Sequence, residues 1–168
     1  IARRAVADLF EIAASQSCTM TCSCVEVYND TCNDLLQPKA AAPLPLREAP
    51  DGVPYIAGLT KEEVTSVEET MAVLARGVSR RTTAQMSMNA RSSRSHAIIS
   101  LELRRDATAA ADGSRIAGRL SLVDLAGMES SKKSYAVEGA SAHGLRREEA
   151  KHINTSLYAL GTVIERLS

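Results

Sequence analysis

The feature that most constrains this chain is the segment 120–127, LSLVDLAG, in which an apolar run ends at Asp124. The run is short and lies between Gly118 and Gly127, so it predicts a buried strand rather than a helix. A carboxylate at the mouth of such a strand is costly to bury unless a cation or hydrogen-bond donors face it. In phosphate-hydrolysing α/β proteins an Asp in this place holds the water shell of Mg²⁺, and a glycine lets its N–H approach a phosphate closely. Ordinary turn chemistry is the alternative, because Asp and Gly are both common where a strand ends.

Charge is balanced over the whole chain but not along it. Lysine and arginine total 20, as do aspartate and glutamate, so no overall field favours nucleic acid or membranes. Residues 76–105, however, contain seven arginines against a single acid, Glu102, which gives a net charge of +6. This stretch suits anions, and a solvated basic face is the alternative.

The cysteines indicate a reducing compartment. Their spacing matches no pattern of paired C-x-x-C zinc ligands, and no histidine lies near them. We interpret them as reduced thiols in a cytosolic protein, with metal binding as the weaker alternative. No apolar run approaches membrane-spanning length, and no signal peptide is visible. Because the chain lacks an initiating Met and opens in a helical pattern, we expect it to be a piece of something longer. The cysteines are Cys18, Cys22, Cys24 and Cys32.

Hydrophobic periodicity predicts a helix, a strand and a loop in the first third of the chain. Residues 1–15 place apolar side chains on one helical face, and 18–28 alternate as a strand does. The segment NDTCNDLL after the strand predicts a turn followed by a short apolar anchor. A proline-rich loop spans 37–54, and LPLRE and VPYIAGLT, in and just after it, are candidates for paired edge strands.

The rest of the chain predicts two further helices and a hairpin. Residues 60–63 and 66–69 are candidate capping boxes, and the second precedes an apolar face that Gly77 can terminate. HAIISLELRR and the predicted strand that ends at Asp124, joined by DATAAADGS, predict a long hairpin. The final helix, roughly 147–167, carries an apolar stripe, and we expect a close neighbour at Gly161 within it.

The second informative segment is NARSSRSH, residues 89–96, just ahead of a predicted strand. Its three serines and two arginines place hydroxyl and guanidinium groups near any ligand at that strand end. Hydroxyls ligate Mg²⁺ or orient a water, and arginine pairs with carboxylates and phosphates. A serine-rich surface loop is the alternative.

Three segments together resemble the motor domain of kinesins. NARSSRSH is similar to the switch I motif N-x-x-S-S-R-S-H, and VDLAGMES is similar to switch II, D-L-A-G-S-E. EEAKHINTSLYALGTVIERL resembles the helix that follows switch II, and VEVYNDTCNDLL and VPYIAGLT agree in order and spacing. The resemblance implies an α/β fold: an incomplete P-loop NTPase motor core of the kinesin type, with a mixed sheet flanked by helices. Residues 1–168 would then be a partial motor domain, with switch I at 89–96, switch II at 124–129 and the long helix at 147–167.

The resemblance implies that the chain is part of a microtubule-based motor. The complete domain would be a microtubule-stimulated ATPase that uses ATP and Mg²⁺, located in the cytoplasm on the microtubule cytoskeleton. Microtubules would be the partner, and neither nucleic acid nor membrane insertion would be involved. The parent protein could dimerise through stalk regions outside this chain. We expect the isolated 168-residue chain to be inactive and to bind ATP poorly.

The resemblance also implies roles for residues of both switches. Ser93 would approach Mg²⁺, and Asp124 would hold its water shell. Asn89 and Ser92 would line the γ-phosphate side of the site, and Gly127 would donate its N–H to that phosphate.

Further roles concern the attacking water, the long helix and the microtubule. Arg94 and Glu129 would form an ion pair that latches the two switches when ATP is bound, which would organise the attacking water. Glu149 and Asn154 match positions that couple the nucleotide state to the long helix. The implied catalytic residues are therefore Ser92, Arg94, Gly127 and Glu129. The cations available for microtubule contact are Lys132, Lys133, Arg146, Arg147 and Lys151, each of which has a solvated surface charge as its alternative.

The largest departure from the family is the phosphate loop. No G-x-x-x-x-G-K-[ST] occurs in the chain, because Leu-Arg follows the suitably spaced Gly139 and Gly144. We expect the chain to begin just after that loop. Met128 stands where the family usually has Ser, which gives slight support to a catalytically degraded relative that binds microtubules or partners. A third possibility, an unrelated Ser/Arg-rich binding module, requires all three matches to be coincidental.

Overall fold

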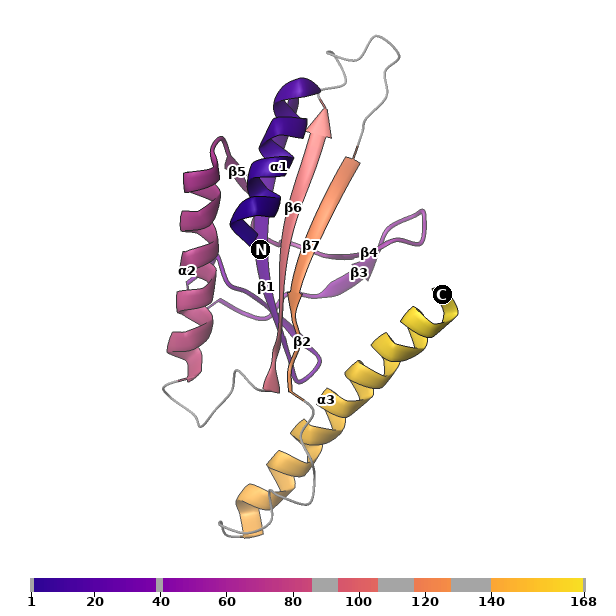
Figure 1. Ribbon diagram of the computed structural model, residues 1–168. Coiled ribbons are helices and arrows are strands. Elements are labelled where there is room, and N and C mark those ends of the chain that lie inside the picture. Colours follow the sequence, from indigo (N-terminus) through magenta and orange to yellow (C-terminus); the bar gives the residue numbers. More distant parts are fainter. Residues whose placement is uncertain (1, 39–40, 86–93, 106–116, 128–139, 168) are drawn as a thin grey trace.

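The computed structural model describes residues 2–38, 41–85, 94–105, 117–127 and 140–167. These residues form three helices and seven strands (Figure 1). The helices are α1 (Ala2–Ser15), α2 (Val67–Gln85) and α3 (Ala140–Leu167). The strands are β1 (Cys18–Tyr28), β2 (Thr31–Asp34), β3 (Leu46–Glu48), β4 (Pro54–Ile56), β5 (Glu62–Val64), β6 (His96–Arg105) and β7 (Ala117–Asp124).

The main sheet has the strand order β2-β1-β6-β7, and β5 pairs with the first half of β1. The pairings between these described strands are antiparallel. The predicted hairpin is confirmed, since β6 and β7 pair along their length from Ala97 with Asp124 to Arg104 with Ala117. The two edge-strand candidates also pair, as β3 with β4 in a small separate sheet.

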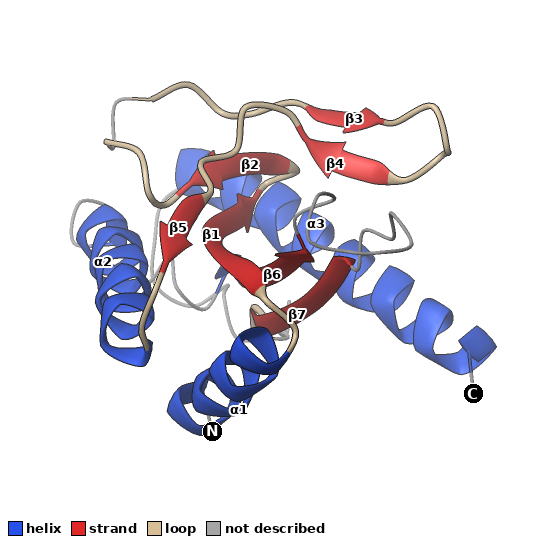
Figure 2. Ribbon diagram, turned by 90° about the horizontal axis from the view of Figure 1, so that it is seen from above, coloured by secondary structure: helices blue, strands red, loops and turns tan. Residues whose placement is uncertain are grey.

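The helices lie on both faces of the main sheet. Figure 2 shows α1 and α2 on one side and α3 on the other. The side chains that alternate toward α1 and α2 are apolar: Met20 and Cys22 of β1 face this side beside Leu103 and Leu101 of β6. With Val6 of α1 they form a buried core, which is why these strands hold their register.

The turn before the Leu35-Leu36 anchor is a full hairpin rather than a simple turn. Asn29 and Asp30 both have positive φ, at 48° and 58°, and they join Tyr28 directly to its partner Thr31. A two-residue loop with two positive φ values matches the right-handed twist of the strands, so the chain returns as β2. Leu35 and Leu36 then bury their side chains as the sequence predicted.

The prediction that Gly77 ends the second helix is wrong, because α2 continues to Gln85. A Cβ at Gly77 would lie 3.1 Å from both Cβ and Sγ of Cys24, so this glycine allows α2 to pack closely on β1. Its φ is not positive, as a glycine helix cap usually requires. Residues 78–85 are therefore helical.

Of the two capping boxes, the second is confirmed and the first is wrong. Ser66 Oγ accepts a hydrogen bond from the N–H of Glu69 at 3.1 Å. Glu69 reaches back to the N–H of Thr65 at 2.8 Å, which holds the pKa of Glu69 below its ordinary value. The first candidate overlaps β5, where pairing with β1 overrides the local helix signal.

The last helix begins earlier than predicted, at Ala140, and its apolar stripe is only partly covered. Ile153 is buried, whereas Leu160 and Ile164 are exposed. No atom of the described structure lies within 4 Å of the Cβ position at Gly161, so the close neighbour expected there is not found. None of the helices in the described residues has the length and apolar character needed to cross a membrane.

Candidate functional site

The two segments singled out by the sequence meet at one end of the main sheet. β6 begins at His96 where β7 ends at Asp124, and the register pairs Ala97 with Asp124 (Figure 1, lower end of the sheet). Arg94 and Gly127 therefore flank the same strand ends. α2 also finishes near this place, since Arg81 in its last turns contacts Asp124 of β7 and Ser95, the residue immediately before β6.

Asp124 is held by Arg81, which the sequence marks only as one member of the basic stretch 76–105. Arg81 Nη1 donates to Asp124 Oδ2 at 2.6 Å, and Arg81 Nη2 donates to the carbonyl of Ser95 at 2.8 Å. The Arg81 side chain is 10 % exposed and the Asp124 side chain 75 % exposed. The buried guanidinium thus orients a carboxylate whose remaining surface faces solvent, where a hydrated cation can reach it.

Arg81 was missed because the helix was expected to stop at Gly77. With α2 extended to Gln85, Arg81 comes to lie against the β6 and β7 ends. The signal that could have found it is the acid at a strand mouth, which requires a nearby donor or cation.

His96 joins the segment after β7 to α3. The N–H of Ala126 donates to His96 Nδ1 at 3.0 Å, and His96 Nε2 lies 2.9 Å from Ser156 Oγ. The Ser156 hydroxyl donates to the carbonyl of Ile153 at 2.8 Å. Because Nδ1 accepts and the serine proton is already used, Nε2 carries the imidazole proton and the ring is neutral.

The surroundings of His96 favour this neutral form. Desolvation lowers the pKa of His96, and the positive charge of Arg81 lowers it further. Neither Arg81 nor Ser156 stood among the predicted site residues, and His96 appeared only as the last letter of the switch I motif.

We expect the folded chain to lose stability as the pH falls below about 6.5, the ordinary histidine value. The pKa of His96 is lower in the folded state than in the unfolded state, so its stabilising contribution is complete above that value. The contribution is lost as the pH falls toward the lowered folded pKa, because the unfolded state then binds the proton more readily. Urea unfolding at about pH 7.5 and about pH 5.5 measures the change.

His96→Asn supplies the comparison for this measurement. The variant should lose less stability than the wild type between the two pH values, since the carboxylates titrate equally in both. An identical pH dependence in the two chains would show that His96 does not sense protons.

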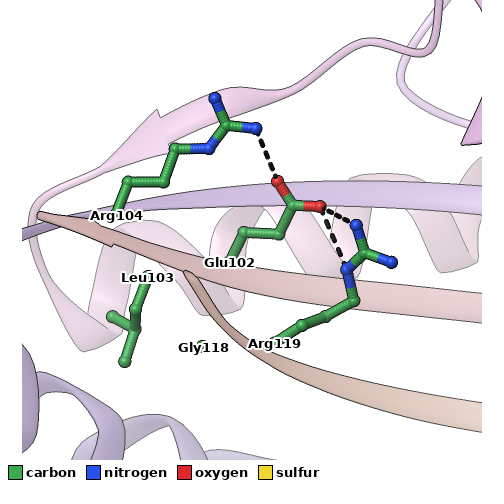
Figure 3. Close-up of a pocket in the computed structure, with 5 residues that line it drawn as sticks. All are labelled: Glu102, Leu103, Arg104, Gly118 and Arg119. Carbon is green, nitrogen blue, oxygen red and sulfur yellow. Dashed lines mark hydrogen bonds and ion pairs between the residues drawn. The ribbon is translucent and has the colours of Figure 1, made fainter. Parts of the chain in front are cut away.

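A second polar cluster lies toward the other end of β6 and β7 (Figure 3). Glu102 accepts two hydrogen bonds from Arg119, at 2.6 and 3.1 Å, and others from Arg104 at 3.3 Å and Lys61 at 2.7 Å. Burial alone would raise the pKa of Glu102, but the hydrogen bonds from Lys61 and Arg119 outweigh it and lower the pKa. These cations are arranged around one carboxylate of the chain itself, so we interpret the cluster as a structural tie between strands.

Only part of the predicted site falls within the described residues. Arg94, Asp124 and Gly127 are described, and they lie at the same end of the main sheet. Lys151 and Asn154 are exposed on α3. The other predicted site residues on α3 are described by their backbone alone. Those positions are Arg146, Arg147 and Glu149. Asn89, Ser92, Ser93, Glu129, Lys132 and Lys133 lie outside the described residues.

The described residues alone would not hold a metal without added ligands. No three His, Cys, Asp or Glu side chains gather as a metal site within the described ranges. A cation here would rely on Asp124 together with hydroxyl groups and water, which is the donor set that Mg²⁺ prefers.

Comparison with known proteins places this geometry in one family. A family model described as the kinesin motor domain matches residues 1–168. Kinesin-related protein 5 of Dictyostelium discoideum is 41 % identical over 150 residues, which cover 89 % of this chain and 14 % of that protein. Kinesin-like protein KIFC2 of Homo sapiens is 42 % identical over 173 residues, which cover 99 % of this chain and 20 % of that protein.

A solved structure agrees with these relatives. It is described as the structure of a fast kinesin, with implications for ATPase mechanism and interactions with microtubules. It matches 98 % of this chain and 45 % of its own, with a TM-score of 0.77 and 36 % identity. The match confirms the expected α/β fold class. The chain spans less than half the length of this solved chain and a fifth or less of the two relatives. On the family model, the relatives and the fold together, this chain belongs to the kinesin motor-domain family.

Proposed function

We propose that this chain is the part of a microtubule-stimulated ATPase motor that senses the γ-phosphate of ATP. The observation that carries the proposal is the convergence of residues 94–96 and 124–127, the described parts of the two switch segments, at one end of the sheet. There Asp124 is oriented by the buried Arg81. Membership of the kinesin motor-domain family supports it. The phosphate-loop pattern G-x-x-x-x-G-K-[ST] does not occur in these 168 residues.

The residues present fit magnesium and a nucleotide phosphate. Asp124 offers an exposed carboxylate that Arg81 keeps in place, and Ser93 would add a hydroxyl, so these two residues would hold Mg²⁺, the former through water. When bound, Mg²⁺ neutralises negative charge on the phosphates. Gly127 is exposed and, without a Cβ, can bring its N–H close to the phosphate, beside Asn89 and Ser92.

The remaining roles concern the attacking water and the track. Arg94 and Glu129 would close as an ion pair over the site, holding the water in line with the phosphate and excluding bulk solvent. Lys151 is exposed on α3. Its positive charge would contact the acidic surface of the microtubule. Lys132, Lys133, Arg146 and Arg147 would extend this contact, and Glu149 and Asn154 would transmit the nucleotide state to α3.

We expect phosphate release by the complete motor domain that contains this segment to accelerate when microtubules are added. Steady-state phosphate release with and without microtubules measures the effect. Asp124→Asn is the matched control, because the amide keeps its size and its oxygen for Arg81 but loses the charge that a hydrated cation needs. The variant should abolish release under both conditions.

A catalytically degraded relative is the second candidate, and Met128 in the place of a serine favours it. It predicts microtubule binding by the complete domain with no stimulated phosphate release. That result would overturn the motor proposal and leave a binding module in its place.

A further inference from the structure

His96 occupies a position that links two elements with different proposed tasks. On one side it accepts the N–H of Ala126, the residue immediately before Gly127. On the other side it contacts Ser156 Oγ of α3, the helix that carries Lys151. One side chain therefore bridges the proposed phosphate-sensing segment and the proposed microtubule-binding helix.

The bridge is directional and fully satisfied. Ala126 N–H donates to Nδ1, Nε2–H donates to Ser156 Oγ, and the serine hydroxyl donates to the Ile153 carbonyl. An aromatic ring fixes the separation and angle of its two nitrogens. Hydrogen bonds weaken steeply when their angles change, so Ala126 and Ser156 cannot shift independently without breaking one of them.

Among the described side chains of α3, residues 151–166, the buried one lies beside this contact. Ile153, one turn before Ser156, is buried, whereas Tyr158, Val163 and Ile164 farther along the helix are exposed. A second polar contact lies one turn earlier, where His152 Nδ1 is 2.6 Å from Asp30 Oδ2 in the turn between β1 and β2. That second pair is largely exposed and so constrains the helix weakly.

We propose that His96 is a positioning residue that couples the segment after β7 to α3. The inference rests on the proposed function, in which a phosphate acts on Gly127 and a microtubule acts on α3. A ligand that moves Ala126 pulls on Ser156 through the imidazole, and a partner that moves α3 pulls on Ala126 in return. Such coupling is reciprocal by thermodynamic necessity.

The test uses the complete motor domain and measures kcat and KM for ATP with and without saturating microtubules. Ser156→Ala removes the acceptor for His96 and leaves Ala126 untouched. We expect it to reduce the microtubule stimulation of kcat by about tenfold, the loss expected of one well-placed hydrogen bond, while the basal kcat and the KM stay at their wild-type values.

Three further variants make the result specific. Ser156→Thr keeps the hydroxyl and should retain the stimulation. Thr162→Ala is the matched control, because its hydroxyl donates to the Tyr158 carbonyl within α3. Asp30→Ala removes the contact with His152 described above, and it should leave the stimulation intact.

The outcomes separate this inference from the proposed function. Full stimulation in Ser156→Ala would overturn the inference while leaving the motor proposal standing. Equal losses in Asp30→Ala and Ser156→Ala would also overturn it, since any anchor of α3 would then serve. A wild-type domain without stimulation would defeat the proposed function first and this inference with it. His96→Asn combined with Ser156→Ala should be no worse than the more severe single variant, because both interrupt one path.

Discussion

Replacing Arg94 with alanine in the complete motor domain should slow ATP hydrolysis by on the order of a hundredfold or more, while nucleotide affinity stays nearly unchanged. Arg94 would contribute mainly when Glu129 closes on it, so its loss acts on the transition state rather than on ground-state binding. Its backbone is well placed for this task, because Arg81 holds the carbonyl and hydroxyl of the adjacent Ser95. Single-turnover hydrolysis and equilibrium nucleotide binding separate the two effects.

Arg104→Ala is the control for this experiment, since it removes an exposed arginine from the far end of β6, the strand that follows Arg94. It should hydrolyse ATP at the wild-type rate. If Arg94→Ala instead abolished nucleotide binding, the pair with Glu129 would be structural and the proposed latch would be wrong.

Leu101→Ala should have the largest effect on folding, lowering the free energy of unfolding by about 2–5 kcal/mol. Leu101 is 1 % exposed and lies in the middle of the sheet, between Cys22 of β1 and Leu120 of β7. Strands on both sides fix its backbone, so the site cannot collapse to fill the cavity. Urea unfolding followed by circular dichroism measures the change.

Leu46→Ala provides the comparison, because Leu46 is 66 % exposed on β3. Its effect should remain within about 0.5 kcal/mol. A similar small loss at Leu101 would mean that the centre of the sheet repacks freely, contrary to the register described above.

Local sequence patterns were sufficient to predict those helices and strands that are specified by residues within the element itself. Alternation identified β1 and β6, and the capping residues at Ser66 and Glu69 identified the start of α2. The end of α2 was not predictable in this way. Whether Gly77 caps the helix or packs within it depends on Cys24 of another element, which sequence spacing does not reveal.

The same distinction between local sequence signals and long-range contacts applies to the site. Each switch segment is an unbroken run of residues, so its resemblance to a family could be recognised. Their meeting at one end of the sheet follows from the predicted hairpin between the two strands. The hydrogen bonds of Arg81 with Ser95 and of His96 with Ser156 join residues 14 and 60 positions apart. Their partners include backbone groups, which every residue possesses, so no pattern of side chains marks them in advance.

The close approach of α2 to β1 at Gly77 also divides the cysteines into two chemical classes. Cys22 and Cys24 are buried under the helix. The hydrogen bond that the Cys24 thiol donates to Cys22, together with burial, raises the pKa of Cys24, so its thiolate does not form near neutral pH. Cys18 and Cys32 are partly exposed. A maleimide dye would therefore react at Cys18 and, more slowly because burial raises the pKa of its thiol, at Cys32. It would leave Cys22 and Cys24 unlabelled while α2 covers them. The chain thus contains its own attachment point for fluorescence labelling at Cys18, which pairs with Arg105 at the end of the sheet opposite His96.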